Sequence, residues 1–87
     1  MWLTRTDRPP RRDPHGGWKL SMIAAHKPLT IRITDEAVRE IAQPSASANA
    51  FYENRLLFEE IADRKYERQE FEPDGSIKVE PSDFLSH

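Results

Sequence analysis

Residues 45–72 read SASANAFYENRLLFEEIADRKYERQEFE, which we interpret as one long amphipathic helix. On a helical wheel its apolar side chains gather into a single stripe: Ala50, Phe51, Leu57, Phe58, Ile61 and Ala62. A stripe at this spacing is typical of a helix that packs on a core. Tyr52 and Leu56 fall on the other side, among Glu59, Glu60 and Asp63. The pattern therefore predicts a helix with a core-facing stripe and a second, small apolar spot on an acidic face.

Two stretches before this helix alternate apolar and polar residues, as half-buried strands do. They are residues 18–22, WKLSM, and residues 29–33, LTIRI. The short link between them contains a proline and predicts a hairpin. Thr34 follows directly and is suited to cap a short helix over residues 35–42, with Asp35 and Glu36 in its first turn.

The C-terminal part predicts one more strand. Pro73-Asp74-Gly75 is a strong turn signal, and residues 76–80, SIKVE, alternate after it. The fold class that we expect is therefore α+β. A small antiparallel sheet, made of the N-terminal hairpin and the C-terminal strand, packs with one short and one long helix.

The first seventeen residues differ in composition from the rest. They contain three prolines and two glycines among charged side chains, which predicts a flexible basic arm ahead of a single domain over residues 18–87. Residues 1–20 carry a net charge of +3 (five bases, two acids), and residues 21–87 carry −5 (eight bases, thirteen acids). Met22 offers an internal start codon, which leaves open whether residues 1–21 are a functional arm.

Composition limits how the domain is stabilised. The 87 residues include no cysteine, which excludes disulfides and a zinc-finger scaffold. A chain of this size buries roughly 60% of its unfolded surface, so self-association as a dimer is a common way to gain stability. The sequence has no apolar run near the ~18 residues that span a bilayer, and its N-terminus does not predict a signal peptide. We therefore expect a cytoplasmic protein that makes no membrane contact.

The titratable side chains predict no catalytic, cofactor or metal site. His15, His26 and His87 have no second ligand at metal-binding spacing. Glu59 and Asp63 stack on one helix face with Glu67, an arrangement that is typical of a solvated acidic face. A hydrolase would need Glu59 or Asp63 to face a pocket. We expect a protein that is not an enzyme and takes no small-molecule substrate.

Two surfaces are candidates for binding a partner. Tyr52, Arg55 and Leu56 lie together on the polar side of the helix, and Tyr and Arg are enriched in protein interfaces. Contact with another protein, or with a second copy, through these residues is our first hypothesis. The alternative is an accessory protein whose arm contacts nucleic-acid phosphates through four arginines: Arg5, Arg8, Arg11 and Arg12.

The second half of the chain also resembles a known family. The resemblance rests on Ala50-Phe51, Asn54-Arg55, Ile61-Ala62, Asp74-Gly75-Ser76-Ile77-Lys78-Val79 and Asp83-Phe84, with Ile31-Arg32-Ile33-Thr34-Asp35-Glu36-Ala37 ahead of them. Together these runs resemble the small bacterial family named domain of unknown function 1488, over about residues 29–84. The resemblance implies a small cytoplasmic α+β domain and a structural or binding role for Asn54 and Arg55. It implies no activity, and the arginine-proline arm departs from the family pattern.

Overall fold

The computed structural model describes residues 2–42 and 50–85 of the chain. In chain order its elements are β1 (Leu3–Arg5), β2 (Arg11–Arg12), β3 (Trp18–Ala24), β4 (Lys27–Ile33), α1 (Asp35–Ala42), α2 (Ala50–Glu53), α3 (Arg55–Glu67), β5 (Ile77–Val79) and α4 (Ser82–Leu85). This is the α+β fold that the sequence predicts. None of the helices in these two ranges has the length and apolar character needed to cross a membrane.

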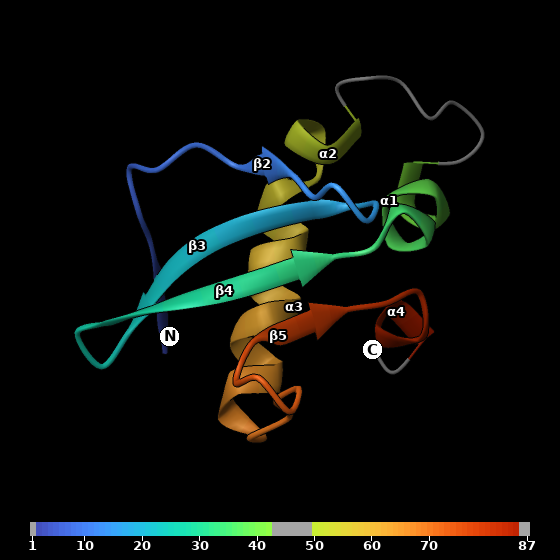
Figure 1. The fold of residues 1–87 in the computed structure, drawn as a ribbon. Coiled ribbons are helices and arrows are strands. Elements are labelled where there is room, and N and C mark those ends of the chain that lie inside the picture. The colour runs from blue at the N-terminus through green and yellow to red at the C-terminus, as the bar shows by residue number, and fades with distance from the viewer. Residues whose placement is uncertain (1, 43–49, 86–87) are drawn as a thin grey trace.

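The strands form one sheet in the order β1-β3-β4-β5, and β2 pairs with β3 on the same side as β1. The pairs that involve β3 are antiparallel, whereas β5 runs parallel to β4. Our expectation of a purely antiparallel sheet is therefore wrong for the last strand. In chain order the helices α1, α2 and α3 come between β4 and β5 and lie on one face of the sheet, and β5 enters in the same direction as β4 (Figure 1).

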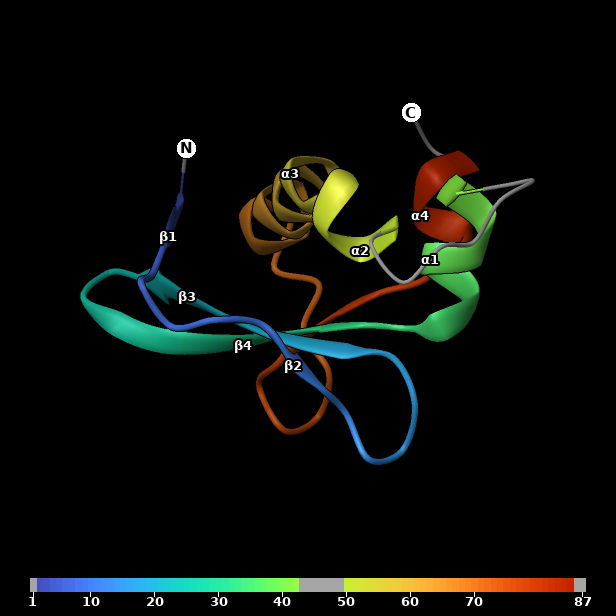
Figure 2. The same cartoon turned by 90° about the horizontal axis from the view of Figure 1, so that it is seen from above.

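The helices all lie on one side of the sheet (Figure 2). The alternating residues Leu20, Met22, Ile31 and Ile33 point to that side and are buried. From the helices, Phe51, Phe58, Ile61 and Ala62 complete the core, as the apolar stripe predicts. The exposed fraction of each is 2% or less.

Aromatic rings run through this core in a continuous row. The Trp18 and Phe51 rings stack with centroids 4.5 Å apart, Phe51 lies 5.6 Å from Phe58, and Phe58 lies 6.1 Å from Phe84. The row joins β3, α2, α3 and α4, so each of these elements packs an aromatic side chain against the next.

The long helix differs from the expected one. Instead of continuing over 45–72, it divides at Asn54, whose φ and ψ are −114° and 14°, and it ends at Glu67; residues 45–49 lie outside the described part. The Asn54 amide donates to the Phe51 carbonyl at 3.2 Å, a tight turn that closes α2 before α3 begins. At the other end, amides of Gln69 and Glu70 bond back to the Tyr66 and Lys65 carbonyls at 3.0 and 2.9 Å, the pattern of a Schellman cap.

The N-terminal segment is also different from our prediction. Residues 2–12 follow the edge of β3 instead of extending as a flexible arm, since residues 3–5 and 11–12 are strands of the sheet. Leu3 is only 2% exposed. The backbone amides of Trp2 and Leu3 both donate to Asp63 Oδ1 at 2.7 Å. Pairing with β3, one buried leucine and one helix carboxylate thus help to hold the segment to the domain.

The hairpin and the short helix form close to where the sequence predicts them. The strands β3 and β4 extend two residues further than expected at the turn, which leaves only Ala25 and His26 between them, with φ of 52° and 68°. At the start of α1, the Ala37 amide donates to Thr34 Oγ1 at 3.0 Å, which confirms the predicted cap. β5 lies within the predicted strand over 76–80.

Candidate functional site

The three residues of the expected helix surface do not act together. Tyr52 and Leu56 are 51% and 58% exposed, but Arg55 is only 17% exposed. Its Nε lies 3.2 Å from Glu59 Oε2, one turn along the helix. Arg55 therefore contacts another residue of the domain. Of the expected surface, only the side chains of Tyr52 and Leu56 are exposed.

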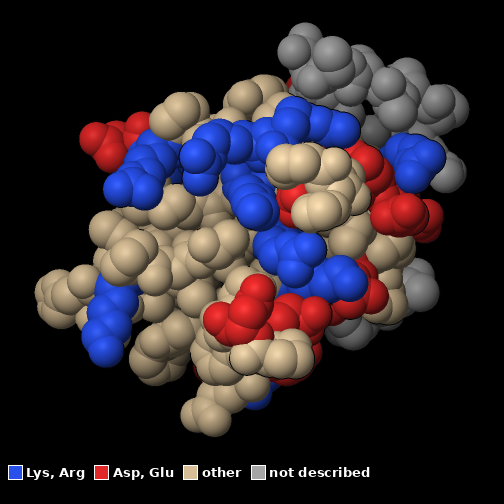
Figure 3. All heavy atoms as spheres, in the orientation of Figure 1, with Lys and Arg blue, Asp and Glu red and all other residues tan. Residues whose placement is uncertain are grey.

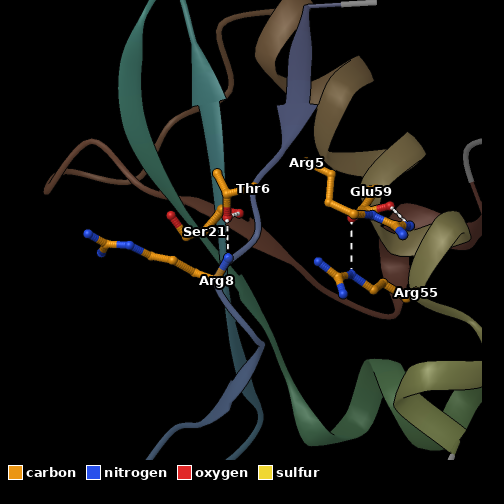
Figure 4. A network of polar contacts seen from close by, with 6 residues as sticks. All are labelled: Arg5, Thr6, Arg8, Ser21, Arg55 and Glu59. Atoms are coloured by element: carbon orange, nitrogen blue, oxygen red, sulfur yellow. Dashed lines mark hydrogen bonds and ion pairs between the residues drawn. The ribbon is translucent and has the colours of Figure 1, made fainter.

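Glu59 is buried between two arginines rather than solvated on an acidic face (Figure 4). Its Oε2 accepts a hydrogen bond from Arg5 Nε at 2.8 Å as well as the one from Arg55. The carboxylate raises the pKa of Arg5, by hydrogen bonding first and by its charge second. The prediction of a solvated Glu59 is wrong because α3 turns this residue toward β1. As a result Arg5 is committed to the fold and leaves the set of candidate phosphate contacts.

Of the other three arginines of the N-terminal segment, one contacts neighbouring side chains of the domain and two are exposed. Arg12 lies 5.3 Å from the centre of the Trp18 ring, and its Nη1 lies 3.2 Å from Asp35 Oδ1. Arg8 and Arg11 are exposed. The loop that carries Arg8 is anchored because Thr6 Oγ1 donates to the Ser21 carbonyl at 3.0 Å, and Arg8 itself points away from the helices (Figure 4).

The face of the sheet opposite the helices carries a row of four cations. Register pairing sets Arg11 opposite Lys19 (β2 and β3), Lys19 opposite Arg32 (β3 and β4), and Arg32 opposite Lys78 (β4 and β5). We call these four residues the cation row. A band of basic side chains crosses this face of the molecule in Figure 3. Like charges directly opposite one another destabilise a sheet, so packing alone does not explain the row.

The next positions on the same face are progressively less polar. Ser21 pairs with Thr30 two residues along the strands, and Ile23 pairs with Pro28 two residues further. The hydroxyl pair lies beside the cation row and supplies two further hydrogen-bond donors. The uncovered face thus changes from basic to polar to apolar toward the β3–β4 turn.

Two open depressions lie over the cation row and share Lys19 and Thr30. The larger, of about 490 Å³, also includes Arg32, His15, Asp13 and Asp74 in its lining. The second, of about 390 Å³, is bordered by Arg8, Pro9 and Arg11. In Figure 2 the β2–β3 loop and the chain before β5 project below the sheet, and they form the rim of the larger depression. No Trp, Tyr or Phe ring lines either depression in the described part of the chain.

Three carboxylates partly balance the charge of the row, and one of them, Glu80, lies 3.8 Å from Lys78 Nζ. Asp13 has a lowered pKa because its Oδ1 accepts the His15 amide at 3.0 Å, and because Lys19 and Arg32 lie nearby. Its Oδ2 lies 3.8 Å from Arg32 Nε. The pKa of Asp74 is lowered mainly by hydrogen bonds from Ser76. Within residues 2–42 and 50–85, Arg11 and Lys19 form no ion pair within 4.0 Å, so two of the four cations of the row stay available for an anion.

Sequence reasoning missed Lys19, Arg32 and Lys78. Strand alternation does place Lys19 and Arg32 on the outer face of the hairpin, but it does not give the register that sets them opposite each other. The parallel pairing of β5, which adds Lys78, depends on the tertiary fold. The signal that could have found the Lys19–Arg32 pair was the length of the hairpin turn, because a two-residue turn fixes which residues of the two strands lie opposite each other.

Across the described residues, no group of three or more His, Cys, Asp or Glu side chains is placed to hold a metal ion. Comparison with known proteins adds no relative: no family model, no curated protein and no solved structure matches the chain. The resemblance to the domain of unknown function 1488 family therefore stays a prediction from sequence.

Proposed function

We propose that this protein binds the phosphate backbone of nucleic acid across the uncovered face of its sheet. The observation that supports the proposal most is the cation row, four basic residues in register on four neighbouring strands. This is the nucleic-acid alternative from the sequence, with a different set of residues. Arg8 and Arg11 remain in it, Arg5 and Arg12 leave it, and Lys19, Arg32 and Lys78 join.

The dimensions of the row suit a run of phosphates. Neighbouring strands lie about 4.8 Å apart, so three steps across the sheet span roughly 14 Å. Arginine binds phosphate through two parallel N–H donors, and lysine contributes a point charge. The adjacent hydroxyls of Ser21 and Thr30 add neutral donors to the same surface. Self-repulsion within the row is relieved when a polyanion neutralises it.

The surface predicts binding without base specificity. Sequence-specific binding to single strands relies on aromatic rings that stack bases, and neither depression is lined by Trp, Tyr or Phe in the part of the chain that the structure describes. Phosphate contacts fix position and orientation and carry no direct sequence information. The net charge of −2 then acts as an orienting device, because the acidic remainder of the surface is repelled by the same polyanion.

The test is a salt titration of binding to a fluorescent DNA duplex, followed by anisotropy. A protein that neutralises Z phosphates on a duplex shows a slope of log K against log salt concentration of about −0.9Z, so each cation removed should reduce the slope by roughly 0.9. The double variant Lys19→Gln and Arg32→Gln should therefore lose about two units of slope on this scale. The matched control is Arg39→Gln with Arg68→Gln, two exposed arginines on helix α1 and at the end of α3.

The control should leave both affinity and slope unchanged. Two results would reject the proposal: wild-type protein that does not bind the duplex at 25 mM salt, a condition chosen because the Debye length is then about 20 Å, or a Lys19 and Arg32 double variant that binds as the wild type does. Equal losses in the double variant and the control would show attraction by overall charge, with no defined face.

Protein contact through Tyr52 and Leu56 is the second candidate function. It is supported by the exposure of both side chains at the junction of α2 and α3. Replacing both with serine should leave the fold intact and weaken association measured by sedimentation. Unfolding of that variant would show that the pair belongs to the core.

A further inference from the structure

A third depression lies at the C-terminal end of α3 and involves none of the cation row. Its volume is about 280 Å³, and its lining residues are Trp2, Tyr66, Glu67, Gln69 and Phe71. Three of the five are aromatic. We call this feature the aromatic depression.

The rings stand around a space instead of filling it. The Tyr66 and Phe71 rings are 5.6 Å apart and nearly perpendicular, with an interplanar angle of 82°. Trp2 and Phe71 are 56% and 42% exposed. Among the described residues the Trp2 ring stacks on no other ring, although it borders the same depression.

The walls are held in place by the backbone around them. The Trp2 amide is fixed to Asp63 Oδ1 at 2.7 Å, and Tyr66 accepts a hydrogen bond in the cap of α3. Gln69 occupies that cap with φ of 60°, a conformation that costs a non-glycine residue about 1–2 kcal/mol and that glycine usually occupies. A strained residue with a polar side chain, at the edge of an exposed aromatic site, is a feature that functional sites share.

The lining chemistry selects a cation. Aromatic faces carry a negative quadrupole that attracts ammonium groups, and rings set at an angle to one another can turn more than one face toward a single guest. Glu67 adds a carboxylate that forms no ion pair within 4.0 Å in the described chain. The nearby Arg68 lies 4.0 Å from Glu70, which offsets its charge.

The size of the depression selects a single side chain. Its 280 Å³ is below the usual range for small-molecule sites, about 300–1,000 Å³, and the site is open to solvent. We propose that the aromatic depression binds the ammonium end of a lysine side chain, methylated or unmethylated, on a partner protein. The site is independent of the phosphate-binding face, so either proposal stands if the other fails.

The experiment is an NMR titration of the ¹⁵N-labelled full chain with three capped amino acids: lysine, trimethyllysine and norleucine. The first two are cations, and norleucine has the same aliphatic stem without the charge. The two tryptophan indole N–H signals report directly, since Trp2 borders the site whereas Trp18 packs against Phe51. A contact of this size predicts dissociation constants of about 1–10 mM.

Both cations should shift the Trp2 indole signal and leave that of Trp18 in place. Phe71→Leu and Glu67→Gln should each weaken binding by about 2- to 5-fold, the effect of one exposed cation–π or ion contact. Tyr52→Leu, which removes an aromatic ring of similar exposure elsewhere, is the matched control and should leave the affinity read from the Trp2 signal unchanged. Its Trp18 signal is not used, because the Tyr52 and Trp18 rings lie 5.5 Å apart. Norleucine binding as tightly as the cations, or a Trp2 signal that no cation shifts, would overturn the proposal.

Discussion

Removing one charge from the centre of the cation row should make the protein more stable while it weakens nucleic-acid binding. Lys19 is the position to change, because it has a like charge on both sides, Arg11 and Arg32. We choose Lys19→Thr, since threonine suits a strand and leaves the hairpin register unaltered. The variant therefore removes two of the three repulsive pairs in the row.

The magnitude follows from the spacing of the strands. Charged ends about 6 Å apart in water repel by roughly 0.7 kcal/mol, so two pairs amount to about 1.4 kcal/mol without salt. Asp13, which lies near Lys19, is an attractive contact that the variant also loses. Taking one attraction of similar size against two repulsions leaves a net gain of about 0.7 kcal/mol, which corresponds to a melting temperature higher by roughly 3–6 °C for a domain of this size.

The assay is thermal and urea unfolding at 10 mM and 1 M NaCl, with Lys27→Thr as the control. Lys27 is an exposed lysine of β4 whose partner is the uncharged Ala24. The gain at position 19 should shrink to about a tenth or two of its value at 1 M, where the Debye length is about 3 Å, and the control should show no salt-dependent gain. A Lys19→Thr protein that is less stable at low salt, or whose gain persists at 1 M, would refute repulsion within the row.

Three further predictions concern the loops and the carboxylates. Gln69→Gly should raise the free energy of unfolding by about 1 kcal/mol, measured by urea denaturation, because glycine adopts the positive φ without strain; no change would mean that the cap relaxes around glutamine. Gly17→Ala should cost at least about 3 kcal/mol, since the backbone strain adds to a clash of the new Cβ with the Ile33 carbonyl oxygen of β4. Gly75→Ala meets no atom within 4 Å and should cost only about 1–2 kcal/mol, so comparable unfolding free energies for the two variants would contradict this order. The pKa values of Asp13 and Asp74 are lowered in the folded protein, so the stability that these carboxylates add is complete above about pH 4 and is lost as the pH falls through the folded pKa values. Between pH 2 and 6, the urea midpoint should therefore fall less steeply with decreasing pH for Asp13→Asn than for the wild type. Identical slopes would show that Asp13 does not contribute to the acid sensitivity.

The parts of the fold set by local pattern were predictable from the sequence. The hairpin, the cap of α1 by Thr34 and the buried stripe of α3 each depend on residues a few positions apart. The turn of the hairpin was not anticipated at two residues, because Ala25 and His26 are unusual at positive φ, where Asn and Gly are common. Alternation nevertheless placed the strands correctly.

The predictions that were wrong concern residues that are held by contacts between distant parts of the chain. Leu3 and Arg5 belong to a strand of three residues, too short to show a period, and are held by β3 and α3. Glu59 reads as solvated from the helical wheel, yet it is buried because two arginines, one of them 54 positions away, satisfy it. The cation row could not be predicted for the same reason, because it depends on the register of β4 with β5, which aligns Lys78 with Arg32.

The parallel docking of β5 has a consequence for the order of folding. The β3–β4 hairpin closes a two-residue turn, whereas β5 reaches β4 only after residues 34–76 form a loop, which costs about 3 kcal/mol more chain entropy. Hairpins form within about 1–10 μs, so the last strand joins a sheet whose other members can already be assembled. Lys78 arrives with that strand. Lys78 therefore joins the basic face after the hairpin that carries Lys19 and Arg32, and each transient release of β5 from the native sheet interrupts that face.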